Sequence, residues 1–500
     1  MNLNAPEYRT KVLGCWLGKN IGGTLGAPFE WRRQINDVSF YTQDLGGEPL
    51  PNDDLDIQLL WLVALEEMGP DLDAHALAEY WLLYVTPHWC EYGNAKINLQ
   101  TGLMPPLSGS LNNPYKHSCG CFIRSEIWGC VAPGCPDVAA RYAYEDGILD
   151  HGDGEGLFGE VFCAALESAA FVQGDLRELI DIGLSYIPGD CGIARAVRQV
   201  IDSYDSGMPW RDARDRLLGE FRGSTHMGYE WCTSEEDRAK GFHEGELGWD
   251  APSNVALVVL GLLYGEGDFA STLCTTVNCG EDTDCTAATV GAIWGIIHGA
   301  EAIPEEWIEP IGRTIKTACL NLGELGFLGN QLPQNVDDLT ARTEAMARQV
   351  LGRIRRGIAL SDAPTDLAGL PRLAGHDRRQ APYSALGGTR HRFAFFDVVV
   401  DYGGDPSLKP GQARSVTLKL TNRYKIPATL RIKWYLPEGI EIDPAPFASV
   451  HVKQAPFPCE GSVAFHLSTE EPLEGPIRAA VEITRAGHAE VMVVPVVLTG

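Results

Sequence analysis

The spacing of apolar and polar residues divides the chain into two regions of different character. Through much of residues 1–352, apolar residues recur every three or four positions, which is the period of an amphipathic helix. Several of these stretches begin at a polar cap and end at Gly or Pro, as with Asp73 before 74–84 and Gly69-Pro70 after 54–67. The pattern predicts helices over residues 8–25, 54–67, 74–84, 157–172, 255–264, 286–299, 313–320 and 336–354. Strands do not alternate with these helices, so a doubly wound nucleotide-binding fold is not supported.

The pattern changes after the last predicted helix. Residues 355–390 carry Pro364, Pro371, Pro382 and the basic pair Arg378-Arg379, a composition typical of a linker. From residue 391 apolar and polar positions alternate in short runs, which predicts strands over 392–400, 415–420, 429–435, 462–467, 477–484 and 490–498. We therefore expect a multidomain protein with an all-α catalytic domain (1–354), a linker (355–390) and an immunoglobulin-like β-sandwich accessory domain (391–500).

Two of the predicted helices carry small residues at every fourth position. The first series is Gly14, Gly18, Gly22 and Gly26, and the second is Ala287, Gly291, Gly295 and Gly299. A glycine inside a helix costs about 1 kcal/mol relative to alanine, so such a series needs a compensating interaction. We infer that these helices pass close to other helices at the centre of the domain, or to each other. The alternative is that Gly22-Gly23 and Gly26-Ala27-Pro28 form turns.

Composition narrows the classes of function. The chain has 500 residues, 45% apolar and 21% charged, which is typical of globular domains. Its net charge of −27 would repel a nucleic-acid backbone, although bound cations would let a small anionic ligand enter. The 14 cysteines are scattered, and no basic-then-apolar leader precedes the first helix, so free thiols and a cytoplasmic location are expected. No apolar run reaches the roughly 18 residues of a membrane span. The oligomeric state stays open.

Two acidic clusters each open an apolar helix. They are Asn52-Asp53-Asp54-Leu55-Asp56 and Gly280-Glu281-Asp282-Thr283-Asp284-Cys285. A helix N-cap explains one Asp in each cluster but not a string of them. If the fold brings the clusters together, their carboxylates repel one another unless hard divalent cations such as Mg²⁺ or Mn²⁺ bind between them. A pair of such ions suits hydrolysis by an activated water.

The same motifs resemble a known family. Residues 280–293, GEDTDCTAATVGAI, resemble the Gly-x-Asp-Thr-Asp-Thr-x-Ala-Ala-x-x-Gly-Ala signature of the ADP-ribosylglycohydrolases, which include dinitrogenase reductase-activating glycohydrolase and the ADP-ribosyl-acceptor hydrolases. Asn52-Asp53-Asp54 is similar to the family's Thr-Asp-Asp, residues 18–30 to its N-terminal segment, and residues 120–124 to its Gly-Ala-x-Met-Arg stretch. Residues 151–156 fall where the family has a ligand-contacting His. The resemblance covers most of residues 8–350.

The resemblance implies an all-α domain with two Mg²⁺ ions, in some cases Mn²⁺, at its centre. These ions bind the ribose end of an ADP-ribosyl group and a water. Carried over by position, the metal ligands are Asp53, Asp54, Asp282 and Asp284. The adjoining Asn52 and Cys285 are further candidate ligands. Glu30 corresponds to a mobile carboxylate that assists acid–base chemistry, so the implied catalytic set is Glu30, Asp53 and Asp284.

The chain departs from the family pattern at three positions. Asn52 replaces Thr but keeps an oxygen that can bind a hard cation. Cys285 replaces Thr or Ser, and a soft thiolate matches Mg²⁺ poorly, so one ion is expected to be held more weakly or by a carbonyl or water. Thr24 stands where the family has Asp. These differences leave the exact substrate open.

Other polar residues are candidates for binding substrate. The loop His151-Gly152-Asp153-Gly154-Glu155-Gly156 precedes an apolar helix, and its amides could face an anion, with His151, Asp153 and Gly154 as contacts. A lone His is more often structural. A second wall is expected from Ser118, Cys119 and Gly120, and Trp249 offers a stacking surface.

Together these features predict a metal-dependent hydrolase of a glycosidic bond at the anomeric carbon of a ribosyl or related sugar. Its substrate would be a small molecule or an ADP-ribosylated macromolecule. Two alternatives remain: a hydrolase of a different N- or O-glycoside on the same fold, and a binder of ADP-ribose or sugar without catalysis.

Overall fold

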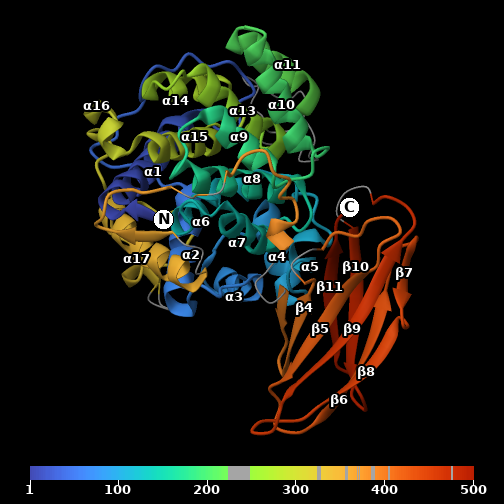
Figure 1. Ribbon diagram of the computed structural model, residues 1–500. Helices are drawn as coiled ribbons and strands as arrows, with labels where there is room; N and C mark the ends of the chain where they lie inside the picture. Colours follow the sequence, from blue (N-terminus) through green and yellow to red (C-terminus); the bar gives the residue numbers. More distant parts are fainter. Residues whose placement is uncertain are drawn as a thin grey trace. The chain divides into compact units, whose positions relative to one another are not determined.

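The structure is a computed structural model, shown in Figure 1. It describes residues 1–222, 248–323, 328–354, 358–368, 370, 372–383, 389–403, 406–473 and 477–500. The chain forms two compact units, Met1–Arg378 and Arg379–Gly500, so the division falls inside the predicted linker. Parts of that linker (355–357, 369, 371 and 384–388) lie outside the described residues.

The first unit is built of helices. They are α1 (Ala5–Gly26), α2 (Asp53–Met68), α3 (Ala74–Tyr84), α4 (Cys90–Gln100), α5 (Leu107–Ser110), α6 (Glu126–Val131), α7 (Pro136–Asp150), α8 (Glu155–Ala170), α9 (Leu176–Leu184), α10 (Gly192–Asp205), α11 (Trp210–Phe221), α13 (Ala251–Tyr264), α14 (Phe269–Asn278), α15 (Thr283–His298), α16 (Glu305–Ile308) and α17 (Val336–Ile354). Short 3₁₀ turns are η1 (Ala27–Phe29), η2 (Phe122–Arg124), η4 (Ala300–Ala302), η5 (Leu328–Asn330) and, in the second unit, η6 (Ala381–Tyr383).

All but one of the helices predicted from the sequence are present, and their ends follow the expected capping. The Asp73 side chain accepts the N–H of Ala76 at the start of α3, and Asn52 accepts the N–H of Asp54 at the start of α2. Gly69 ends α2 with a positive φ of 78°. Sequence reasoning missed α4, α5, α6, α7, α9, α10, α11, α14 and α16. Among the described residues, no helix is both long and apolar enough to span a membrane.

The helix predicted over 313–320 is wrong. This segment is not helical: it forms bends and isolated β-bridges, because its backbone groups bond to other parts of the unit. The N–H groups of Ala318 and Cys319 both donate to Asp56 Oδ2 at 2.6 Å, and the carbonyl of Cys319 accepts the N–H of Thr86 at 2.8 Å. Tertiary bonding to Asp56 therefore overrides the local apolar spacing.

Helices α1 and α15 cross at the distance that their glycines allow, and they lie side by side in Figure 1. A Cβ atom placed on Gly18 would lie 2.1 Å from the carbonyl oxygen of Gly291, and one on Gly22 would lie 2.0 Å from that of Ala287. At the ends of the contact, Gly14 faces Gly295 and Gly26 faces Thr283. The inference of close packing is confirmed and the partners are each other. Because α1 is continuous to Gly26, the alternative of a turn at Gly22-Gly23 is wrong, whereas Gly26-Ala27-Pro28 is where α1 ends and the 3₁₀ turn η1 begins.

The second unit is the predicted β-sandwich, formed by two antiparallel sheets. One sheet has the order β11-β10-β6-β8 and the other β3-β4-β5-β9-β7. Both contribute to one core that includes Val398, Leu418, Trp434, Phe465 and Val481. The strands are β3 (Thr389–Arg392), β4 (Phe396–Asp401), β5 (Arg414–Asn422), β6 (Ala428–Tyr435), β7 (Ile440–Asp443), β8 (Phe447–Val452), β9 (Glu460–Thr469), β10 (Ile477–Arg485) and β11 (Val491–Leu498).

One predicted strand and part of the predicted linker need correction. The run predicted over 392–400 is two strands, because the chain reverses between β3 and β4, where the N–H of Phe393 donates to Phe396 O. Within the predicted linker, β2 (Ala359–Ser361) pairs in parallel with β1 (Asn2–Asn4), so this part of the linker belongs to the first unit.

The glycine contact leads to a stability prediction. Gly18→Ala should lower the free energy of unfolding by about 3 kcal/mol, because the added methyl group forces α1 away from the backbone of α15. Gly352→Ala, on the exposed side of α17 where an added Cβ meets no atom within 4 Å, is the control and should raise it by up to about 1 kcal/mol. Urea unfolding measures both. Equal effects of the two substitutions would contradict the packing of α1 on α15.

Candidate metal centre

The two acidic clusters meet in the folded chain. One ligand atom from each of Glu30, Asp282 and Asp284 lies within 4.8 Å of the others. The same holds for Asp54, Asp284 and Cys285. Asp284 belongs to both groups, so the two groups share one carboxylate. The predicted convergence of segments more than two hundred residues apart is therefore present.

The contact between α1 and α15 explains why Glu30 reaches this place. Gly26, the last residue of α1, packs on Thr283, and the Thr283 hydroxyl donates to the Gly26 carbonyl at 2.8 Å. The chain then passes through η1 to Glu30. Beyond it, the N–H of Trp31 donates to Glu281 O at 2.9 Å. Glu30 is thus held beside the first turn of α15.

Neighbouring polar groups orient the second cluster. The side-chain oxygen of Asn254, in the first turn of α13, accepts the N–H of Asp282 at 3.2 Å. The Glu281 side chain forms an ion pair with Arg222 instead of joining the cluster. Of this acidic string, only Asp282 and Asp284 are grouped with Glu30.

The first cluster enters the site from the start of α2. Asp53 lines the cavity described below and accepts a hydrogen bond from the Tyr92 hydroxyl at 3.2 Å. Asp54 is buried, with Oδ1 3.4 Å from Cys285 Sγ and Oδ2 3.6 Å from Lys19 Nζ. Asn52, predicted as a metal ligand through its oxygen, uses that oxygen to cap α2 and directs Nδ2 toward Asp284 at 3.5 Å. The structure places it beside the two groups rather than in them.

The clustered carboxyl groups are electrostatically strained. Burial, together with repulsion from Asp284 and Asp282, raises the pKa of Glu30 to about 11. Burial and the nearby Asp53 raise the pKa of Asp284 to about 6. Burial also raises the pKa of Asp53, Asp54 and Asp282. The site therefore favours protons or cations between its oxygens.

Three buried carboxylate oxygens of the site also lack a hydrogen-bond partner among the described residues. Asp54 Oδ2, Asp282 Oδ1 and Asp284 Oδ1 accept no hydrogen bond from any residue that the structure describes, although these residues are at most 4% exposed. A buried oxygen without a partner costs about 1–3 kcal/mol or more. Oxygen atoms grouped in this way suit hard divalent cations, so the residues present fit a metal centre.

A cavity of about 570 Å³ lies over these groups. Glu30, Asn52, Asp53, Asp282, Asp284 and Cys285 line it, and so do four residues expected to bind substrate: Ser118, Cys119, Gly120 and Trp249. Sequence reasoning missed other lining residues, including Trp31, Trp89, Glu91 and Cys319. Trp31 and Trp89 are 45% and 54% exposed. For Trp31, the signal available in the sequence was a large aromatic residue directly after Glu30.

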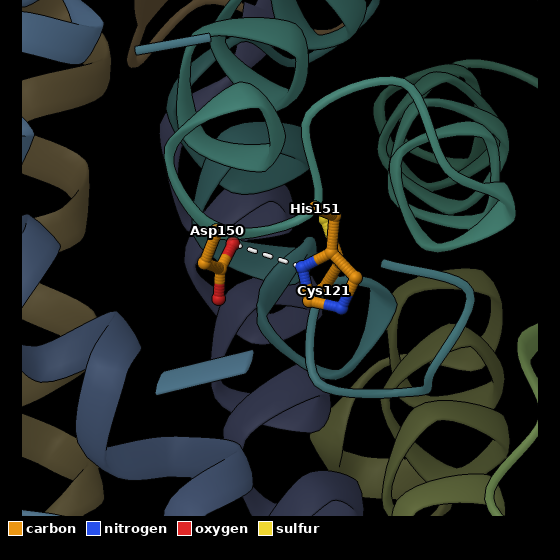
Figure 2. A group of neighbouring side chains, drawn as sticks. All are labelled: Cys121, Asp150 and His151. Atoms are coloured by element: carbon orange, nitrogen blue, oxygen red, sulfur yellow. Dashed lines mark hydrogen bonds and ion pairs between the residues drawn. The ribbon is translucent and has the colours of Figure 1, made fainter. Parts of the chain in front are cut away.

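Three predicted substrate contacts do not line the cavity. His151 is fully buried, and its Nε2 lies 3.1 Å from Ser118 Oγ. Its Nδ1 bonds to Asp150 at 2.9 Å, the contact drawn as a dashed line in Figure 2. Asp153 forms a surface ion pair with Lys116 at 3.0 Å, and Gly154 packs against the Lys116 carbonyl. In this structure His151 contacts Ser118 and Asp150, and the glycine-rich loop packs on Lys116.

The group in Figure 2 differs from the carboxylates of the metal centre because its polar atoms already have partners. Arg124 binds both oxygens of Asp150, at 2.9 and 2.6 Å. The Cys121 thiol donates to Glu160 at 2.6 Å. Cys121, Asp150 and His151 thus form a satisfied structural network.

A comparison with known protein families agrees with the motifs. The family model described as ADP-ribosylglycohydrolase matches residues 4–346, which covers nearly all of the helical region and none of the β-sandwich. A comparison with curated protein sequences gives no match.

The charge of the site leads to a pH-dependent prediction. The raised pKa of Asp284, about 6, means that the metal-free folded protein loses stability as the pH rises from the usual Asp value of about 4 through about 6. Added Mg²⁺ should therefore raise the melting temperature of chelator-treated protein more at about pH 7.5 than at about pH 5. At about pH 7.5 and a Mg²⁺ concentration about a hundredfold above Kd, the gain in the free energy of unfolding should be about 2.7 kcal/mol.

Thermal melts with and without Mg²⁺ at both pH values measure this effect. Asp282→Asn combined with Asp284→Asn should abolish the Mg²⁺ response while the protein still folds. Asp153→Asn, which removes a carboxylate outside the site, should keep the full response. An Mg²⁺ response that survives the double substitution would contradict the proposed location.

Proposed function

Because the chain belongs to the ADP-ribosylglycohydrolase family, we propose that it hydrolyses a glycosidic bond at the anomeric carbon of ADP-ribose or a related ribosyl group. Two divalent cations, Mg²⁺ or Mn²⁺, would bind between the carboxylates. The observation that carries this proposal is the meeting of Asp54, Asp282, Asp284 and Glu30 at one cavity, with buried oxygens that the described residues leave without partners.

The carboxylates have separate roles in this proposal. Asp54 and Asp284 would hold one ion, and Asp282 and Asp284 the other, with Glu30 and Asp53 at the cavity wall beside them. When bound, such a pair of ions polarises substrate oxygens and lowers the pKa of a bound water. Lys19, which is buried and bonded to Glu126 at 2.8 Å, balances part of the charge of Asp54 from behind.

Glu30 is the residue best placed to move a proton. It is half-buried and lines the cavity, and its neighbours on the far side are the carboxylates of α15. A carboxyl group that lies beside the ions without binding them can give a proton to a leaving group. The same group can later take a proton from the attacking water.

The aromatic rim offers a place for the rest of the substrate. Trp31 and Trp249 have ring centroids 5.3 Å apart at an interplanar angle of 76°, and Trp89 also lines the cavity. The faces of such rings stack on a base or on the apolar face of a sugar. We propose that they bind the group attached to the ribose.

The charge of the lining supports a second candidate, a hydrolase of an uncharged N- or O-glycoside. The described lining includes the carboxylates of Glu30, Asp53, Glu91, Asp282 and Asp284 but no Lys, Arg or His. Two divalent cations would offset most of this negative charge without reversing it, so a diphosphate would meet little attraction from side chains.

Removing the carboxyl function of Glu30 tests the proposed reaction. Glu30→Gln should lower kcat about 10²- to 10⁴-fold and leave ligand affinity within a few-fold of the wild type, because the amide keeps the shape but cannot transfer the proton. Steady-state kinetics and calorimetric binding separate the two effects. Glu301→Gln, an exposed carboxylate in η4, should behave as the wild type. A kcat for Glu30→Gln equal to that of the wild type excludes this role.

A substrate panel distinguishes the two candidate functions. The panel contains ADP-ribosyl-arginine, ADP-ribosyl-serine and adenosine, assayed with saturating Mg²⁺. Trp31→Ala should raise KM by about tenfold for the true substrate, because one stacked base contributes about 1–3 kcal/mol. Phe447→Ala, an exposed aromatic residue of the β-sandwich, is the control. Turnover of adenosine alone favours the uncharged glycoside, and tight binding of every compound without turnover identifies a binder instead of an enzyme.

A further inference from the structure

The two donor groups of the metal centre differ in chemistry. Glu30, Asp282 and Asp284 offer oxygen atoms only. The second group consists of Asp54, Asp284 and Cys285, which offer oxygen atoms and one sulfur. Asp284 belongs to both groups. Sulfur and oxygen ligands select different cations: thiolates favour Zn²⁺ and related ions, whereas carboxylates favour Mg²⁺ and Mn²⁺.

Cys285 is placed as a ligand by the helix that carries it. It lies in the first turn of α15, directly after Asp284, and it is 7% exposed at the cavity wall. Its Sγ is 3.4 Å from Asp54 Oδ1. A thiol can donate one hydrogen bond, so Cys285 cannot satisfy the acidic oxygens around it.

The unpartnered oxygens on the same side give a second, independent observation. Asp54 Oδ2 and Asp284 Oδ1 are buried and accept no hydrogen bond from the described residues. Lys19 Nζ is 3.6 Å from Asp54 Oδ2 and already bonds Glu126 and the Ile123 carbonyl. A cation between Asp54, Asp284 and Cys285 would satisfy these oxygens and the sulfur together.

We propose that the two metal positions of this protein are unlike. The position formed by Asp54, Asp284 and Cys285 binds a thiolate-preferring divalent cation of the Zn²⁺ type, and the oxygen-only position binds Mg²⁺ or Mn²⁺. This inference rests on the proposed function for the existence of a two-ion centre. On binding, the Cys285 S–H bond breaks, the sulfur forms a bond to the cation, and the proton leaves to solvent.

Co²⁺ is a suitable probe because a thiolate bound to it absorbs in the near ultraviolet, whereas carboxylates do not. Chelator-treated full-length protein is titrated with Co²⁺, and the absorption and the stoichiometry are recorded together. The wild type should bind two ions per chain and develop the thiolate band. Cys285→Thr and Cys285→Ser should bind Co²⁺ without the band. Cys319→Ser removes a thiol that lines the same cavity outside both donor groups, and it should keep the band.

Affinities give a second readout that is independent of turnover. Cys285→Thr should weaken Zn²⁺ binding by about tenfold or more, because the loss of a residue that only supports a metal ligand already weakens metal binding by about tenfold. The Mg²⁺ affinity of this variant should stay within a few-fold of the wild type. Calorimetry in buffers of different ionisation enthalpy should show about one more proton released by the wild type than by Cys285→Ser.

The outcomes separate the two levels of the proposal. Two Co²⁺ ions bound by the wild type without a thiolate band, or a band that persists in both Cys285 variants, overturns the unlike positions and leaves the proposed function in place. Protein that binds neither Co²⁺ nor Mg²⁺ overturns the proposed function as well. Circular dichroism of each variant checks that the fold is retained.

Discussion

The contact between the backbones of α1 and α15 is the constraint on which the rest of the helical unit depends. Glycine at 14, 18, 22 and 26 lets one helix lie against the carbonyl groups of the other. The same contact ends with Gly26 on Thr283, so it also brings Glu30 to the first turn of α15. The packing of α1 on α15 thus forms the centre of the domain and also places Glu30 beside Asp282 and Asp284.

Repulsion between carboxylates is what connects this fold to chemistry. Lys19 and Arg124 are buried cations in the described part of the unit, but they are bonded mainly to Glu126, Asp146 and Asp150. The carboxylates that meet at the cavity keep raised pKa values and buried oxygens without partners among the described residues. Protons relieve this strain at low pH, and divalent cations relieve it at neutral pH. The family match and the aromatic rim then point to a glycosidic substrate.

Local patterns in the sequence were enough to predict some of these features. Capped apolar stretches predicted α1, α2, α3 and α15, and the four-residue spacing of glycine predicted a close helix contact. Tertiary interactions set the features that could not be predicted. Residues 313–320 do not form a helix, because Asp56 accepts hydrogen bonds from two of their amides. Trp89 and Glu91 reach the cavity from a helix start with no motif. His151 looked like a ligand contact, but its position behind Ser118 depends on the partners Asp150 and Arg124.

The anomalous scattering of Mn²⁺ in crystals of the full-length protein tests the central claim most directly. Data collected at the manganese absorption edge should show a peak beside Glu30, Asp282 and Asp284 and, at saturating Mn²⁺, a weaker second peak beside Asp54, Asp284 and Cys285. Absence of anomalous density between these carboxylates at saturating Mn²⁺, or ions bound only elsewhere on the acidic surface, would contradict a metal centre at the junction of α2 and α15.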